Sequence, residues 1–285
     1  MESKRYVNVF TVPSGSRRKS PRVSDIEARR TWDTHLSTMN PERIAQLLAT
    51  FFAEPSRGEA AAGENVCPLS PKQLEQISTY IDLLLRWNAR INLTAIRTPD
   101  EIVTRHFGES LFAARHLSLT AIGEPGCARF APFAGPNLGP LPSSASPGHL
   151  IDVGSGAGFP GIPIKVWSPS LPVTLIESNQ KKVVFLREVI RALTLTDIDV
   201  FASRAEDHTP GTASLVTLRA VERFHKVLPV AARLLTSDGT LALLIGKSQL
   251  GEARRSLPLF LWSQAIPIPL SSDRVLVLWR TKQCG

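Results

Sequence analysis

The stretch best suited to chemistry is 152–161, which reads DVGSGAGFPG. Its glycines at 154, 156 and 158 allow positive φ angles and let a ligand approach the backbone without meeting a Cβ atom. Their N–H groups precede a predicted helix, whose N-terminus favours polar ligand groups. Glu177 stands 21 residues after Gly156, where a carboxylate can accept hydrogen bonds from both hydroxyls of a ribose. These residues predict a site for a ligand that contains a nucleoside.

Two kinds of cofactor fit this pattern. The stretch 156–161 matches G-x-G-x-x-G, and Glu177 lies at the spacing that a dinucleotide site requires. Asp152 argues against a dinucleotide, because its charge at a strand end would repel a pyrophosphate, whereas S-adenosylmethionine brings a cationic amino group. Pro160 and Pro163 also stiffen the turn, which packing under a pyrophosphate does not require. We therefore favour an S-adenosylmethionine-dependent methyltransferase and keep an NAD(P)-dependent oxidoreductase as the alternative.

Alternating strand and helix patterns place this stretch at the edge of a mostly parallel sheet. Short apolar runs predict strands at 150–153, 173–176, 198–202, 215–218 and 241–245, and helices at 161–167, 181–193 and 222–235. A last strand over 274–279 is expected to pair with 259–266. Such alternation requires right-handed crossovers and gives a doubly wound α/β sheet, whose ligands bind at the carboxyl ends of the strands. In the helix 181–193 we expect these residues to point inward: Val184, Phe185, Val189 and Ile190.

Residues 39–118 predict an N-terminal helical part. Asn40 and Ser70 are each followed by proline, which marks an N-cap and a first helical position. Apolar residues recur at three- and four-residue spacing after both caps, and a third helix starts near Thr98. A Pro-rich segment at 119–148 is expected to be a linker or a tolerated surface insertion, because proline at this density excludes helix and interior strand. The cofactor-binding domain would then cover 149–285.

Residues 1–38 are predicted to be a disordered basic tail. They carry eight Lys or Arg and four acidic residues, so their excess of four is half the chain's formal net charge of +8. Because a folded pattern begins directly after Met39, we hypothesise that Met39 is the true start of the protein. The 285 residues hold no run of roughly 18 apolar residues, and the three cysteines suggest no disulfide framework. We therefore expect a cytoplasmic protein without a membrane segment.

Five stretches, in the same order along the chain, resemble the bacterial small-subunit rRNA guanine-N7 methyltransferases, also called the glucose-inhibited division protein B family. The first two are WNARINLT at 87–94 and HFGESL at 106–111, where Glu109 replaces an aspartate of the family pattern. The cofactor loop 150–163 with ESNQKKVVFL at 177–186 is the third. RAED at 204–207 and RA at 219–220 are the last two. The resemblance covers roughly residues 40–118 and 149–280.

This resemblance implies a class I methyltransferase with a Rossmann-like doubly wound sheet and an N-terminal helical extension. It implies methyl transfer from S-adenosylmethionine to N7 of the guanine at position 527 of 16S rRNA. Its cofactor-binding residues would be Gly154, Gly156, Phe159, Glu177, Ala205, Glu206 and Arg219. Of these, Glu177 would hold the ribose, Ala205-Glu206 would contact the adenine, and Arg219 would face the methyl group or the RNA. No catalytic residue is assigned, because guanine N7 carries a lone pair and no proton that a general base would have to remove. No metal is expected.

The expected partner is 16S rRNA, naked or within a small ribosomal subunit or an assembly intermediate, and the expected state is a monomer. Basic residues of the helical part either position RNA phosphates or form a solvated face: Arg86, Arg90, Arg97 and Arg105. Lys247 is a candidate to replace the lysine that the family has before the glycine at the end of the fifth strand. A non-catalytic RNA-binding protein stays open as a second alternative.

Overall fold

The computed structural model describes residues 39–53, 67–117, 148–221, 223–258 and 261–280. The basic tail predicted at 1–38 lies outside them, as does the predicted insertion at 119–148 apart from its last residue. All of the described residues belong to one compact unit, so the helical part and the sheet can be described together.

The sheet has eight strands, in the order β3-β2-β1-β4-β5-β8-β6, with β7 also paired to β8. The parallel strands are β1 (Leu150–Val153), β2 (Val173–Ile176), β3 (Ile198–Phe201), β4 (Ala213–Arg219) and β5 (Leu235–Gly246). β8 (Arg274–Arg280) runs antiparallel to β5, and β6 (Leu261–Trp262) and β7 (Ile266–Pro267) run antiparallel to β8. Because β1 lies between β2 and β4, the strand order reverses there, and ligands of doubly wound sheets bind at such a point, at the carboxyl ends of the strands. The predicted doubly wound α/β sheet is confirmed.

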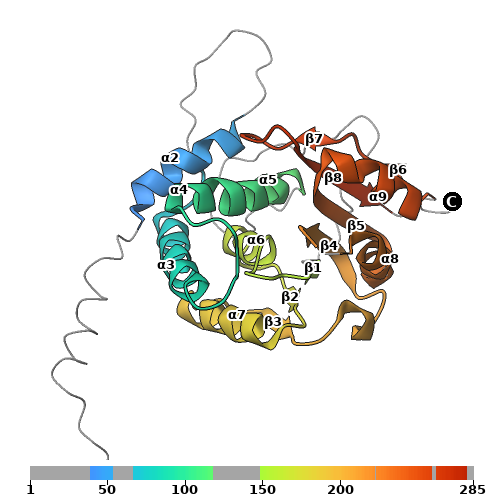
Figure 1. The fold of residues 1–285 in the computed structure, drawn as a ribbon, viewed down its shortest axis with the longest axis horizontal. Helices are drawn as coiled ribbons and strands as arrows, with labels where there is room; N and C mark the ends of the chain where they lie inside the picture. Colours follow the sequence, from blue (N-terminus) through green and yellow to red (C-terminus); the bar gives the residue numbers. More distant parts are fainter. Residues whose placement is uncertain (1–38, 54–66, 118–147, 222, 259–260, 281–285) are drawn as a thin grey trace, which may run out of the picture. The chain divides into compact units, whose positions relative to one another are not determined.

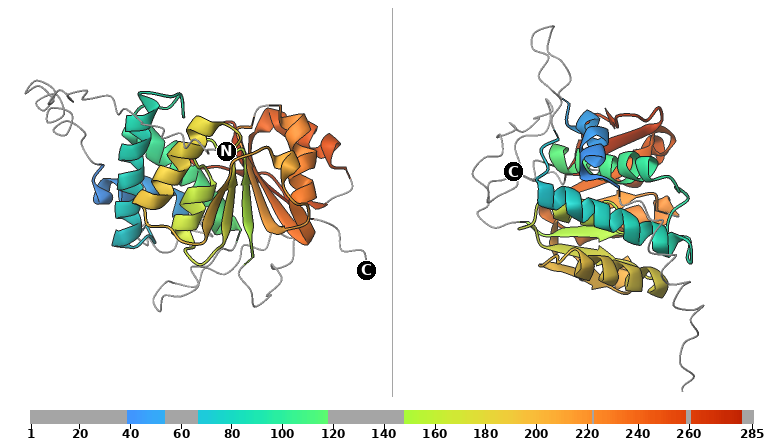
Figure 2. Two further views of the ribbon diagram at one scale, coloured as in Figure 1. Left: turned by 90° about the horizontal axis from the view of Figure 1, so that it is seen from below. Right: turned by 90° about the vertical axis from the view of Figure 1, so that its left-hand side faces the viewer.

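Helices cover both faces of this sheet (Figure 1). α6 (Gly161–Trp167) and α7 (Gln180–Ala192) lie on the same face as the N-terminal helices, and α8 (Phe224–Leu234) and α9 (Leu250–Ser256) lie on the other face. The left view of Figure 2 shows the sheet between these two helical layers. Each face has its own buried apolar cluster. The central strands are therefore covered on both sides, and all four residues of β1 are buried.

The N-terminal helical part starts with α2 (Pro41–Phe52) and α3 (Pro71–Asn88). Both predicted caps are confirmed, because the Asn40 side chain accepts from the N–H of Glu42, and Ser70 forms a capping box with Gln73. α4 (Pro99–Glu101), the π-helical turn η1 (Ile102–Gly108) and α5 (Glu109–His116) follow as one continuous helical run. Within the described ranges no helix is long and apolar enough to cross a membrane.

The stretch 87–94 joins α3 to the sheet layer. Trp87 packs edge-on against Phe185 of α7, with 5.7 Å between the ring centroids. Asn88 is buried at the end of α3, where it accepts hydrogen bonds from the N–H groups of Leu93 and Thr94 and donates to the carbonyl of Thr94. One side chain thus satisfies three backbone groups of the turn. This is a structural reason for the tryptophan–asparagine pair in that stretch.

Two features differ from the sequence predictions. Val184 is 53% exposed, so the prediction that it points inward was wrong, and Val183 and Leu186 are buried instead. Successive residues lie about 100° apart around a helix, so an unbroken run of apolar residues cannot all face the core. The helix α9 was not predicted, because it is short and Ala253 is its one buried residue.

The first residue of α6 tests the packing between that helix and the sheet. A Cβ atom added to Gly161 would lie 2.5 Å from Cδ2 of Leu175 and 2.9 Å from Cβ of Asp152. We therefore expect Gly161→Ala to lower the free energy of unfolding by about 1–3 kcal/mol. Gly251→Ala in α9 is the matched control, since its Cβ would first meet the flexible Arg255 side chain at 3.3 Å. That variant should be neutral or stabilised by up to about 1 kcal/mol. Urea denaturation measures both, and equal losses would contradict this packing.

Candidate functional site

The glycine loop follows β1 at the carboxyl end of the sheet and has the backbone that its sequence predicts. The φ angles are +68° at Gly154, +58° at Gly156 and +87° at Gly158, a region that favours glycine. A Cβ at Gly154 would have its nearest neighbour, Val221, at 3.5 Å, and at Gly156 the nearest atom would be 3.8 Å away. At Gly158 it would lie 2.4 Å from the Tyr80 hydroxyl. The first two glycines therefore leave room for a ligand, whereas the third makes room for protein.

Glu177 directly follows β2 and is bound to this loop. Its Oε2 accepts a hydrogen bond from the N–H of Gly156 at 2.9 Å, and its Oε1 accepts one from the N–H of Asn179 at 2.8 Å. Each carboxylate oxygen retains a further lone pair, so both can still accept a hydroxyl group. The structure thus brings together the loop and the carboxylate that the sequence singled out, and their contact with a cofactor stays a prediction.

Asp152, at the start of the loop sequence, is turned into the protein. It is 1% exposed, with Oδ1 accepting from the Thr217 hydroxyl at 2.8 Å and Oδ2 accepting from the N–H of Gly161 at 3.1 Å. Burial raises its pKa to about 6, although these hydrogen bonds oppose the shift. The sequence argument considered only how the charge of this carboxylate suits the cofactor, and the structure shows that the carboxylate itself is bound within the protein. Asp152 thereby joins β1 to β4 and to the start of α6.

Phe159 belongs to an aromatic cluster that the helical part shares with the loop. Its ring stacks on Tyr80 and on His106, with centroid distances of 5.2 and 4.6 Å, and meets Phe107 edge-on at 5.2 Å. The buried Tyr80 hydroxyl donates a hydrogen bond to the carbonyl of Ala157 within the loop. α3 and η1 therefore hold the loop by aromatic packing and a satisfied polar group. The ring of Phe159 is 6% exposed, and its predicted contact with a cofactor stays a prediction.

Ala205 and Glu206 lie in a 3₁₀ turn, Ala205–Asp207, after β3. Ala205 is buried, whereas the Glu206 side chain is exposed and its carbonyl accepts a hydrogen bond from Arg233 at 2.8 Å. Since β1, β2 and β3 are parallel neighbours, this turn lies at the same edge of the sheet as the loop and Glu177. The three segments predicted to hold the cofactor therefore lie side by side.

Arg219 ends β4 on the other side of the loop and is bound to the helical part. Its Nη2 donates to Oε2 of Glu109 at 3.0 Å and to the carbonyl of Arg105 at 2.5 Å. Nη2 of Arg274 lies 2.9 Å from the same Oε2, and Nε of Arg105 donates to Oε1 at 3.2 Å. We call these four residues, Arg105, Glu109, Arg219 and Arg274, the arginine clasp. The Arg219 side chain is 6% exposed, and its predicted contact with the methyl group or the RNA stays a prediction.

The electrostatics of the clasp are dominated by burial. Burial lowers the pKa of Arg219 to about 10, with Glu109 opposing the shift and the two neighbouring arginines adding to it. His106 stacks beside the clasp, and burial together with the three arginines lowers its pKa to about 3. His106 is therefore neutral at physiological pH, and its Nε2 lies 2.8 Å from the Thr94 hydroxyl.

Lys247 follows β5 at the same edge of the sheet. Its side chain is exposed, and Nζ donates a hydrogen bond to the carbonyl of Ser272 at 2.6 Å. The replacement of the family lysine by Lys247 stays a prediction.

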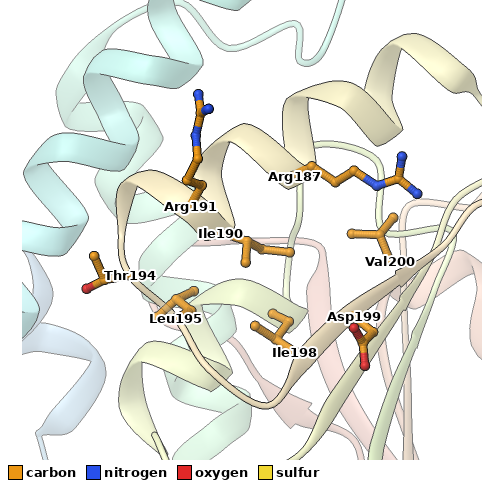
Figure 3. A pocket seen from close by; sticks show the side chains of 8 residues that line it. All are labelled: Arg187, Ile190, Arg191, Thr194, Leu195, Ile198, Asp199 and Val200. Atoms are coloured by element: carbon orange, nitrogen blue, oxygen red, sulfur yellow. The ribbon is translucent and has the colours of Figure 1, made fainter.

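A hollow of about 300 Å³ lies elsewhere, between α7 and β3 (Figure 3). It is lined by Arg187, Ile190, Arg191, Thr194, Leu195, Ile198, Asp199 and Val200. None of the residues predicted to bind the cofactor lines it. This hollow is therefore distinct from the edge of the sheet that carries the glycine loop.

Sequence reasoning missed three residues of this edge: Tyr80, Thr217 and Arg274. A signal existed for Tyr80, because a tyrosine on the apolar side of an amphipathic helix requires a partner for its hydroxyl. Thr217 and Arg274 lie within or at the start of apolar strand runs, where no local pattern marks them.

The model of the rRNA small subunit methyltransferase G family matches residues 73–122 and 140–270. The chain belongs to this family. A ribosomal RNA small subunit methyltransferase G of Xylella fastidiosa is 37% identical over 65% of this chain and 74% of its own length. The protein of the same name from Chloroflexus aggregans is 36% identical over 67% of this chain and 72% of its own length. The protein of the same name from Listeria monocytogenes is 28% identical over 80% of this chain and 92% of its own length.

The chain is accordingly an S-adenosylmethionine-dependent rRNA methyltransferase of the small subunit methyltransferase G family, as its sequence predicted. The two alternatives, an NAD(P)-dependent oxidoreductase and a non-catalytic RNA-binding protein, are set aside. The sheet also argues against a dinucleotide-binding oxidoreductase. In the dinucleotide-binding strand order 3-2-1-4-5-6, the strand beside the fifth is a parallel sixth strand from the second nucleotide-binding half. In this protein the strand beside β5 is the antiparallel β8.

The buried carboxyl group of Asp152 predicts a dependence of stability on pH. Its pKa in the folded protein is about 6 and its ordinary value is 3.8, so between these values the folded state retains a proton that the unfolded chain has lost. The stability contributed by this group is therefore highest below pH 4 and falls by up to about 3 kcal/mol as the pH rises to 6.

We expect Asp152→Asn to lack this loss. The unfolding free energy of the wild type, relative to that of the variant, should fall between pH 4 and pH 7 in urea denaturation. Parallel curves for the two proteins over this range would contradict the raised pKa.

Proposed function

We propose that this methyltransferase methylates N7 of the guanine at position 527 of 16S rRNA, in the cytoplasm and as a monomer. Its substrate is 16S rRNA, either naked or within the small ribosomal subunit or an assembly intermediate. The observation that supports it most is the hydrogen bond between Gly156 and Glu177, which joins a glycine loop of positive φ to a strand-end carboxylate at the carboxyl edge of the sheet. Membership of the rRNA small subunit methyltransferase G family supports the substrate class.

The residues present fit S-adenosylmethionine. The open positions at Gly154 and Gly156 admit a ligand close to the backbone, and Glu177 has lone pairs left for the ribose hydroxyls. Ala205 and Glu206 would flank the adenine, while Phe159 would form the floor beneath the loop. When bound, this cofactor supplies an electrophilic methyl group on a sulfonium centre.

Methyl transfer to guanine N7 requires the base and the methyl group to be aligned, and it requires no proton transfer from N7. N7 carries a lone pair and no proton, so the chain's residues need only orient the base towards the methyl group and exclude water. The ionisable groups nearest the loop suit this role. His106 is neutral, and the carboxylates of Asp152 and Glu109 are each held by two or more partners.

The direct test uses labelled S-adenosylmethionine with rRNA from cells that lack this methyl group. We expect label at N7 of guanine 527, located by the strand cleavage that N7-methylguanine permits. Naked 16S rRNA, assembly intermediates and small subunits should each be offered. If none of the three acquires label in 16S rRNA, the proposed function is wrong.

Gly154→Val tests the loop separately from the RNA. Valine is β-branched and strained at a φ of +68°, and its side chain would enter the space left open for the ligand. We expect loss of cofactor binding in calorimetric titration, with at least 100-fold weaker affinity as a rough expectation. Gly251→Ala should bind as the wild type does. Unchanged affinity in a folded Gly154→Val protein would refute the assignment of the loop.

A further inference from the structure

The arginine clasp lies on the β4 side of the loop, whereas the predicted cofactor contacts Glu177, Ala205 and Glu206 lie on its β2 and β3 side. Arg219 belongs to the clasp and is also one of the residues predicted to bind the cofactor. Glu177 and Ala205 follow β2 and β3, whereas Arg219 ends β4 and Arg274 begins β8, paired with Gly246 at the end of β5. In the strand order β3-β2-β1-β4-β5-β8, these two groups flank β1 from opposite sides. An acceptor base that approached the loop from the β4 side would therefore meet the clasp.

The clasp carries more positive than negative charge. Three guanidinium groups surround the single carboxylate of Glu109, which is 1% exposed. The adjacent His106 is neutral, and the carboxylate of Asp152, whose pKa is influenced by Arg219, is already bound to Thr217 and Gly161. Buried arginines normally find a matching number of acceptors. This cluster is therefore incomplete as a salt bridge.

Its donors are incompletely satisfied as well. Among the described residues, the buried Nε atoms of Arg219 and Arg274 have no hydrogen-bond acceptor. Nη2 of Arg274 lies 2.9 Å from Glu109 but is not aligned for a hydrogen bond with it. A buried donor without an acceptor is costly. These atoms are themselves buried, so an added oxyanion would act at the exposed side of the cluster, where it would balance the excess of positive charge.

Exposure indicates where such an anion enters. The side chain of Arg219 is 6% exposed and forms the closed back of the clasp. The side chains of Arg274 and Arg105 are 20% and 45% exposed and form its open front. A front of two guanidinium groups suits the oxygens of a phosphate, which a guanidinium fork matches geometrically.

We propose that Glu109 is a positioning residue that holds Arg105 and Arg274 to receive a phosphodiester group of the RNA beside the acceptor guanine. This inference rests on the proposed function for the identity of the RNA. Arg274 lies beyond residue 270, where the family match ends.

The decisive variant is Arg274→Gln, with Arg191→Gln as the matched control. Arg191 is an exposed arginine of α7, away from the clasp. Affinity for a 16S rRNA transcript is measured over a range of salt concentrations, and cofactor affinity is measured by calorimetry. We expect Arg274→Gln to bind RNA about tenfold more weakly and to reduce the slope of log K against log salt by about one phosphate contact. Its cofactor affinity should stay within about twofold of the wild type.

Glu109 is tested by a pair of variants. Glu109→Gln keeps the shape of the side chain but removes its charge, so we expect a KM for RNA roughly tenfold higher with a nearly unchanged cofactor affinity. Glu109→Asp restores the charge, so it should reverse at least half of the increase in log KM for RNA that Glu109→Gln causes. A purely structural role would instead lower melting temperature and cofactor affinity together and leave the salt slope unchanged.

Three results would overturn the proposal. The first is an unchanged salt slope in a folded Arg274→Gln protein. The second is an equal reduction in the Arg191→Gln control, which would indicate a general charge effect. The third is a loss confined to cofactor affinity, which would assign the clasp to the carboxylate of the cofactor. RNA binding is measured apart from methylation. A wild type that binds the transcript but labels guanine N7 in none of the three substrate forms would defeat the proposed function and leave the clasp result standing.

Discussion

The contact on which the site depends joins Tyr80 of α3 to the glycine loop. The tyrosine hydroxyl is bound to the carbonyl of Ala157, its ring covers Phe159, and the missing Cβ of Gly158 is what allows the hydroxyl to come so close. A loop with several glycines loses much conformational entropy when it is fixed in one conformation. The contacts of the N-terminal helical part with the loop offset this entropy cost, so the helical part is a structural component of the predicted cofactor site.

Two buried carboxylates extend this connection through the sheet. Asp152 joins β1 to β4 and to the first turn of α6, and Glu109 joins the helical part to the ends of β4 and β8. The guanidinium carbon of Arg219 also lies 6.0 Å from the centre of the Phe159 ring, so the clasp and the aromatic cluster touch. Removing one member of such a buried network leaves a charge or donor without its partner, which costs more than the pair contributes when intact. The elements around the glycine loop are thereby held in one geometry.

Local patterns predicted the fold well, since strands β1 and β2 and the helix α6 have the bounds that their apolar runs indicate. The caps at Asn40 and Ser70 and the positive φ angles of the loop also follow from neighbouring residues alone. Contacts between distant segments were not predictable in this way. The sequence located Asp152 at a strand end but gave no sign that its side chain turns inward, and nothing local links Glu109 to Arg274, which is 165 positions later.

The π-helical turn Ile102–Gly108 makes the length of this segment matter as much as its composition. A π turn holds more residues per turn than an α-helix, and Glu109 follows it directly. Losing one residue there would convert the wide turn into an α-helical turn and shift the positions of the residues within it relative to Glu109. Arg105 and His106 would then leave their places beside Arg219 and Phe159. Insertions and deletions between 102 and 108 should consequently be far rarer among viable relatives than substitutions at the same positions.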